Sequence, residues 1–258
     1  MEMLLALAPG LLVGAGLGFL GGMFGIGGGI IAIPLLGLAY GMDQALAQGT
    51  ALVMMAPNLV VGAWRYHQRD PLPLGPGLAI GSLAMLSTWA SAQWATGLDS
   101  ASLRMIFSIF LLLLALRMLL SGKPRHAKAP PARIPERWAP LVGLVGGCSM
   151  GLLGVGGGLI ATPLLTSLFG LRQTAAQRLA LALVTPSALV ALFTYARAGH
   201  VNWQMGLPLA LSGILTVSAG VRVAHRLPER SMRRAFSWML LGSALWLLGA
   251  PLLKQLGA

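Results

Sequence analysis

Long apolar segments separated by short polar stretches occupy most of this chain of 258 residues. They cover about residues 11–40, 44–64, 75–95 and 103–120, and then about 140–169, 174–195, 204–222 and 234–253. A membrane-spanning helix needs about 20 mainly apolar residues, so the pattern predicts an all-α polytopic membrane protein. A soluble domain has roughly a quarter of its residues charged, whereas only 9% are charged here.

The second half of the chain repeats the first after a shift of 129 positions. The shift superposes GIGGG, residues 25–29, on GVGGG, residues 154–158. It also aligns Pro34 with Pro163, Gln48 with Gln177, Pro57 with Pro186 and Tyr66 with Tyr195. The chain is therefore an internal duplication, with a first membrane repeat over 1–120, a basic linker over 121–138 and a second membrane repeat over 139–258.

The first apolar segment of each half is interrupted by its glycines. The arms on either side have about 12 residues, or roughly 18 Å of helix, whereas the hydrocarbon core is about 30 Å thick. Clustered glycines followed by proline break a helix. The alternative role of the glycines is to let helices pack closely, but small-residue packing motifs leave the helix continuous. We expect each half to contain a broken or re-entrant first helix and three transmembrane helices.

The distribution of Lys and Arg predicts which side each loop occupies. The Lys and Arg residues that give the net charge of +12 lie between the apolar segments, where they indicate membrane topology and not a nucleic-acid partner. With a cytoplasmic linker and hairpin first segments, only Arg104, Arg197 and Lys254 of the 18 cations lie outside. If each first segment instead crossed the membrane once, eight cations would lie outside. Each half then has an odd number of crossings, so we expect inverted repeats and external termini.

Each helix break offers groups that attract an anion. The first turn of the helix after a break has unpaired N–H groups and the positive end of the helix dipole. Matching breaks in inverted repeats are typical of transporters that bind substrate near the membrane midplane. The predicted substrate-binding residues at the breaks are Gly25, Gly27, Gly28, Gly29 and Ile30, and Gly154, Gly156, Gly157, Gly158 and Leu159.

Polar residues on the helices after the breaks form a second group of candidates. They are Gln48, Thr50, Asn58, Gln177, Arg178, Thr185 and Ser187. Each of them could instead bond a neighbouring helix, and Arg178 could extend to the cytoplasmic surface.

The chain offers little for catalysis or metal binding. All six acidic residues lie at termini or in loops, the four histidines lie at loops or helix ends, and Cys148 is the single cysteine. An enzyme would need a nucleophile with a base, or a metal set. We therefore expect no enzyme, no cofactor and no metal; the expected partners are a small anion and the lipid bilayer, and the oligomeric state stays open.

The chain resembles the sulfite exporter TauE/SafE family of membrane permeases over nearly its whole length. The resemblance rests on the doubled G-x-G-G-G motif with its downstream PLL, on the A-x-G-T stretch in ALAQGTAL, residues 45–52, and on the basic linker. It implies transport of sulfite, sulfonate or other small organosulfur or carboxylate anions across the plasma (inner) membrane. An anion channel of the same architecture is the alternative, because a channel and a carrier would share the same motif. In one departure, Arg178 and Leu179 stand opposite Gly49 and Thr50, where the family's second half usually has a small residue and Thr.

Overall fold

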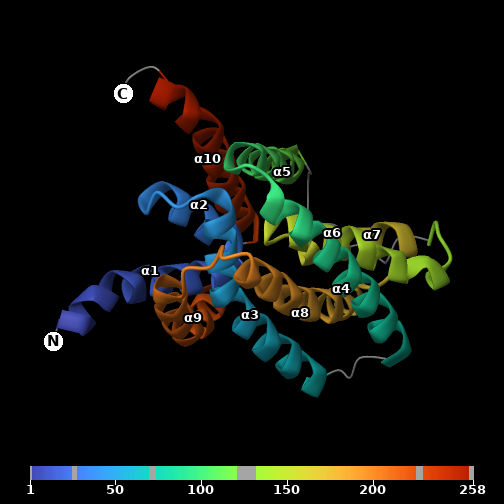
Figure 1. Ribbon diagram of the computed structural model, residues 1–258. Helices are drawn as coiled ribbons and strands as arrows, with labels where there is room; N and C mark the ends of the chain where they lie inside the picture. The colour runs from blue at the N-terminus through green and yellow to red at the C-terminus, as the bar shows by residue number, and fades with distance from the viewer. Residues whose placement is uncertain (1, 25–27, 70–73, 121–131, 225–228, 256–258) are drawn as a thin grey trace.

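The computed structural model describes residues 2–24, 28–69, 74–120, 132–224 and 229–255, and all regular structure in these ranges is helical. The first half contains α1 (Glu2–Phe24), α2 (Gly29–Ala39), α3 (Gln44–Arg69), α4 (Leu74–Gly97) and α5 (Ser100–Leu120). The second contains η1 (Glu136–Leu141), α6 (Val142–Leu153), α7 (Gly157–Phe169), α8 (Gln173–Arg197), α9 (Trp203–Ala224) and α10 (Glu229–Gln255) (Figure 1). The predicted all-α class is confirmed.

The helices have the lengths and surfaces that a bilayer requires. Among the residues that the structure describes, three segments are long and apolar enough to cross a membrane: Gln44–Trp64, Ser100–Leu120 and Ala175–Arg197. Helices α4, α9 and α10 have 24, 22 and 27 residues, which at 1.5 Å per residue also exceeds about 30 Å. All seven tryptophans are 48–63% exposed, as expected for side chains at membrane interfaces.

The first apolar segment of each half is broken in two, as predicted. Helix α1 ends at Phe24 and α2 begins at Gly29, while α6 ends at Leu153 and α7 begins at Gly157. The φ angles of Gly28, Gly154 and Gly156 are 80°, 67° and 93°. This left-handed region favours glycine, which has no Cβ to clash there. The glycine run therefore ends one helix and permits the turn into the next.

The two arms of the second broken helix form a hairpin. The carbonyl oxygen of Leu168, near the end of α7, accepts hydrogen bonds from the N–H groups of Arg133 and Ile134 at 2.8 and 3.0 Å. Both donors precede η1 and α6, so the end of α7 lies beside the start of the unit. Helices α6 and α7 have 12 and 13 residues, as expected, but α1 has 23 because it continues back through a stretch rich in Leu and Ala to Glu2.

The helices of the two halves interdigitate. Helix α1 packs mainly on α9, and its sequence counterpart α6 packs mainly on α4. Helix α3 lies against α8, and α5 lies against α10. In Figure 1, α3 and α8 occupy the middle, with α1 and α2 on one side and α6 and α7 on the other. Each of these four pairs joins one half to the other, so the main packing surfaces are shared between the halves.

Two matching rows of glycine make close contacts between the halves. Gly14, Gly18 and Gly22 lie on one face of α1, and the same shift of 129 residues brings them onto Gly143, Gly147 and Gly151 of α6. A Cβ at Gly18 would overlap the backbone of Gly213 in α9, and a Cβ at Gly147 would overlap Ser87 and Ala84 of α4. Small residues at four-residue spacing allow this backbone approach in membranes. Glycines outside the breaks thus also contribute to the packing between the halves.

We expect Gly18→Ala to destabilise the protein, because the added methyl group would meet the α9 backbone. Overpacking of this kind costs about 1–3 kcal/mol. Gly16→Ala is the matched control on the same helix, since nothing lies within 4 Å of its added carbon and Ala favours a helix over Gly. Thermal unfolding of both variants in detergent measures the difference, and equal melting temperatures would contradict the assigned packing.

Candidate substrate site

The two helix breaks meet in the interior of the protein. A Cβ at Gly29, the first residue of α2, would lie 2.8 Å from Cγ1 of Val155 in the second break. Gly29 is buried, and Val155 is only 1% exposed. The glycine motifs that the duplication relates in sequence are therefore neighbours in space. Gly25 and Gly27 lie outside the described residues.

Both second arms begin at this meeting point. In α2 the N–H of Ile31 bonds the carbonyl oxygen of Gly28 at 3.1 Å, and in α7 the N–H of Ile160 bonds that of Gly156 at 3.0 Å. The N–H groups before these positions belong to first turns, which lack intrahelical partners. They include those of Ile30 and Leu159, as predicted, and each turn carries the positive end of its helix dipole.

Apolar side chains of α3 and α8 cover the glycines. A Cβ at Gly28 would lie 2.8 Å from Cε of Met54, and Met55 lies against Gly29. In the second half, Leu183 and Val184 stand at the matched positions and pack against Gly157. A Cβ at Gly157 would also lie 2.9 Å from the carbonyl oxygen of Gly146. At these positions the glycines allow close packing. They therefore serve the packing role that was the alternative to breaking the helix, in addition to lying at the helix breaks.

Gly158 differs from its neighbours. A Cβ there would lie 3.5 Å from Cγ2 of Val184, which is an ordinary contact. Its backbone is in the first turn of α7, and its φ is not positive. Packing therefore does not demand glycine at this position, unlike at Gly157.

Gln48 of α3 is the buried polar side chain beside the second break. Its Cβ would lie 3.3 Å from a Cβ added at Gly154. The side chain is fully buried, and its Nε2 has no hydrogen-bond partner. A buried donor without an acceptor costs about 1–3 kcal/mol. Its sequence counterpart Gln177 is exposed on α8, so the duplication is not symmetric here.

Tyr195, which was not among the predicted site residues, holds Gln48 in place. The hydroxyl oxygen of this buried residue lies 2.7 Å from Oε1 of Gln48 and 3.1 Å from the carbonyl oxygen of Gly151. The contact joins α8 to α3 and α6. A tyrosine within an apolar helix needs a partner for its hydroxyl, and the pairing of Tyr66 with Tyr195 in the duplication was the signal that could have identified it.

The other predicted residues lie elsewhere on α3 and α8. The Thr50 hydroxyl oxygen accepts a hydrogen bond from the Asn202 N–H at 3.0 Å, and the Thr185 hydroxyl lies 3.5 Å from the carbonyl oxygen of Leu59. Ser187 is fully buried, and its hydroxyl has no partner. Asn58 and Arg178 are half-buried. Thr50 and Thr185 thus have structural bonds, whereas Ser187 has an unused polar group.

Metal ligands do not gather in the part of the chain that the structure describes. It contains no group of three or more His, Cys, Asp or Glu side chains that could hold a metal ion. The groups at the breaks suited to a ligand are the first-turn backbone N–H groups and the amide of Gln48. They are hydrogen-bond donors, and donors at a helix N-terminus suit an anion.

The fold and the site together define a polytopic helical membrane protein in which two broken helices meet at a buried point. A family model described as sulfite exporter TauE/SafE matches residues 10–247. The chain therefore belongs to the TauE/SafE family, and it is a membrane transporter. The family resemblance found in the sequence is confirmed.

Curated relatives support the same class. The chain is 25% identical over 257 residues to a probable membrane transporter protein of Methanocaldococcus jannaschii, covering 93% of this chain and 94% of the relative. It is 30% identical over 168 residues to one of Haemophilus influenzae, covering 61% of each. No solved structure matches the chain. The relatives' names describe transporters without a stated substrate, so the expectation of a transporter and not an enzyme is confirmed.

We expect Tyr195→Phe to lower the free energy of unfolding by about 1–3 kcal/mol, because Gln48 and Gly151 would lose a buried donor. Tyr40→Phe is the matched control, since Tyr40 is 39% exposed. Thermal unfolding in detergent compares the two variants with the wild type. A Tyr195→Phe protein as stable as the Tyr40→Phe protein would remove the assigned role of this hydroxyl.

Proposed function

We propose that the protein is a secondary transporter for small anions, namely sulfite, sulfonate or other organosulfur or carboxylate anions. The observation that carries the proposal is the contact of Gly29, at the start of α2, with Val155 in the second break. Two helix N-termini thereby share one buried point, and their first-turn N–H groups and dipoles favour negative charge. Oxyanions carry several acceptor atoms that such donors can share.

Gln48 completes this donor set in the proposal. Its Nε2 is buried without a partner beside Gly154, and an anion oxygen would supply the missing acceptor. Tyr195 holds the other end of the amide through Oε1. Binding of the anion would then remove the cost of leaving the amide unpaired. Gln48 would therefore contribute to the affinity for the anion.

The apolar cover of the glycines favours a carrier over an anion channel. Met54, Met55, Leu183 and Val184 pack on the site from α3 and α8. A channel needs a conducting path past these side chains, whereas a carrier needs only that they move during its cycle. Methionine is flexible enough to do so.

We further propose that the two halves are inverted, with re-entrant hairpins, a cytoplasmic linker and external termini. Hydrogen bonds at the end of α7 support a hairpin in the second half. The N–H groups of Arg133 and Ile134, which precede η1, bond the carbonyl oxygen of Leu168, so both arms of this broken helix return to one end. The bond from the Gln44 N–H to Ser100 Oγ, at 3.1 Å, joins the segments before α3 and after α4, which two crossings bring to one end in either topology.

We expect one or more of sulfite, sulfate, thiosulfate, sulfoacetate and small carboxylates to raise the melting temperature of the purified protein, because a ligand of the folded state stabilises it. Gln48→Leu should weaken the apparent affinity by roughly tenfold or more, since a hydrogen bond to a charged group contributes about 1.5–3 kcal/mol. Uptake into proteoliposomes should fall with it.

Gln44→Leu is the matched control for this experiment. Gln44 lies on the same helix, is 2% exposed and also has an unpartnered Nε2, but it lies one turn before Gln48. The Gln44→Leu protein should bind and transport the anion as the wild-type protein does. Equal affinity in both variants would remove Gln48 from the site, and a panel in which no anion stabilises the wild type would contradict anion transport.

We expect cysteines introduced in a Cys148→Ser protein at Ala132 and Ser231 to react with an impermeant thiol reagent only from the cytoplasm, because both positions belong to predicted cytoplasmic segments. A cysteine at Ala198 should react only from outside. All three positions are exposed, and labelling in sealed vesicles of known orientation makes the measurement. Labelling of position 231 from outside would refute the inverted arrangement.

A further inference from the structure

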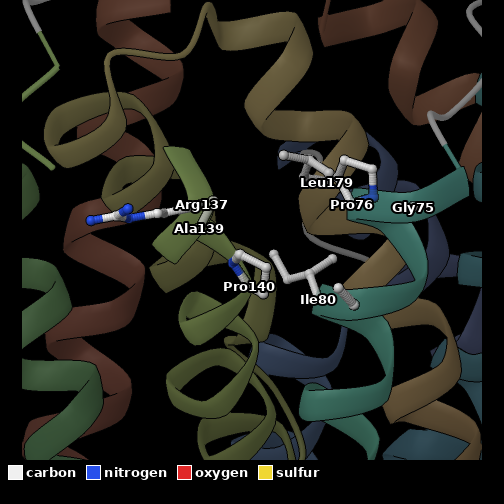
Figure 2. A pocket seen from close by; sticks show the side chains of 8 residues that line it. Gly75, Pro76, Ile80, Arg137, Ala139, Pro140 and Leu179 are labelled. Atoms are coloured by element: carbon white, nitrogen blue, oxygen red, sulfur yellow. The ribbon is translucent and has the colours of Figure 1, made fainter. Parts of the chain in front are cut away.

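A cavity of about 290 Å³ opens between α4, η1 and α8, near the start of α6. Its apolar walls include Pro76, Ala79, Ile80, Ala139, Pro140 and Leu179. Figure 2 shows the labelled α4 residues facing Ala139 and Pro140 across the opening. Arg137, the charged residue of the lining, directs its guanidinium group away from the other labelled side chains (Figure 2).

The matched positions of the other half are packed together. The shift of 129 residues relates Ala139 to Gly10, and relates Pro76 and Ala79 to Met205 and Pro208. A Cβ at Gly10 would lie 3.3 Å from Cβ of Pro208 and 3.5 Å from Sδ of Met205. The same three positions thus make contact in one half and line a cavity in the other.

The packed end also has a polar lock. Thr50 Oγ1 of α3 accepts a hydrogen bond from the Asn202 N–H at 3.0 Å, and Gly49 lies so close to the carbonyl group of His200 that a Cβ would overlap it. At the cavity end, Leu179 replaces Thr50 and offers no acceptor, while Arg178 replaces Gly49 and carries a long side chain. Of these two matched positions, therefore, only Thr50 can accept such a hydrogen bond.

A continuous face of α8 leads from the cavity to the second break. Leu179 lines the cavity, and Leu183 lies one turn further along the same helix. Leu183 is fully buried, and a Cβ added at Gly146 or Gly157 would lie 2.9 or 3.4 Å from its methyl groups. Leu183 thus stands between the cavity and the first turn of α7.

We propose that the cavity is the open mouth of the transport path on the linker side, with Leu183 as its inner gate, and that the bond between Thr50 and Asn202 locks a second mouth at the opposite end. The proposal rests on the transporter function above. In the opposite state, Ala139 packs against Ala79 as Gly10 now packs against Pro208, and the segment 198–202 moves away from α3.

The test breaks the lock and follows both ends of the molecule without an anion. Thr50→Val removes the acceptor, and Thr194→Val is the matched control, because the buried Thr194 hydroxyl bonds only within α8, to the carbonyl oxygen of Val190 at 2.9 Å. One reporter, in a Cys148→Ser protein, is the rate at which Met205→Cys reacts with an impermeant thiol reagent. The other is the rate of disulfide formation between Ala79→Cys and Ala139→Cys.

We expect Thr50→Val to raise both rates together by roughly three- to tenfold, since a lost hydrogen bond shifts the equilibrium between the two states by about that factor. A closed mouth that copies the packing of Gly10 on Pro208 has a Cβ separation near the range that a disulfide needs, about 3.5–4.5 Å. Thr194→Val and Thr50→Ser, which keeps the hydroxyl, should react as the wild type does.

Two results would overturn the proposal. Faster labelling at position 205 without faster disulfide formation would mean that Thr50 only holds a local loop and that the cavity does not close when this loop opens. No change in either rate would mean that the bond is no lock. If Thr50→Val does not fold, Gly49→Ala, which displaces the His200 carbonyl group, should raise the same two rates.

These readouts separate the mouths from the anion site. Neither rate requires a bound anion, so coupled gating can fail while the thermal shifts with anions succeed. If the gating results hold and no anion stabilises the protein, the proposed substrate class fails while the path remains.

Discussion

Broken backbone inside a membrane is tolerated only where protein surrounds it, because lipid offers no partner for a free N–H or C=O group. This constraint governs the whole arrangement. The two breaks lie against each other at Gly29 and Val155, and side chains of α3 and α8 cover them. Since α3 and α8 come from different halves, the breaks are buried only when both halves are assembled.

Glycine serves two purposes in this fold, and some glycines of the breaks serve both. In the rows on α1 and α6 it removes side chains, so that these helices seat against the backbones of α9 and α4. In the breaks it supplies a positive φ at Gly28, Gly154 and Gly156, which ends one helix and starts the next. The rows fix where the arms lie, and the breaks then place two helix N-termini at one buried point.

The sequence predicted the elements better than their partners. Glycine runs and apolar lengths have local causes, so the broken helices and the three helices after each could be read from the residues. The pairing of α1 with α9 could not be, because a lipid-facing surface and a protein-facing surface are both apolar. The four-residue spacing of Gly14, Gly18 and Gly22 is the sequence signal for this helix pairing. It lies beside the denser glycine motif at residues 25–29, on which the predictions were based instead. Gln48 was selected as a polar residue in a span, whereas the role of Tyr195 depends on a contact between residues 147 positions apart.

If both halves had the same sequence, the two ends of the proposed transport path would have identical surroundings. The state open at one end and the state open at the other would then have equal free energies. Here small differences at matched positions separate the ends. Thr50 against Leu179 changes a hydrogen-bond acceptor into an apolar side chain, and Gly10 against Ala139 changes how closely two helices can approach. Because a lost hydrogen bond and an altered contact each contribute only about 1 kcal/mol, such differences can favour one state without preventing the other. A transporter needs that balance, since a mouth held too firmly would stop the cycle in which both must open in turn.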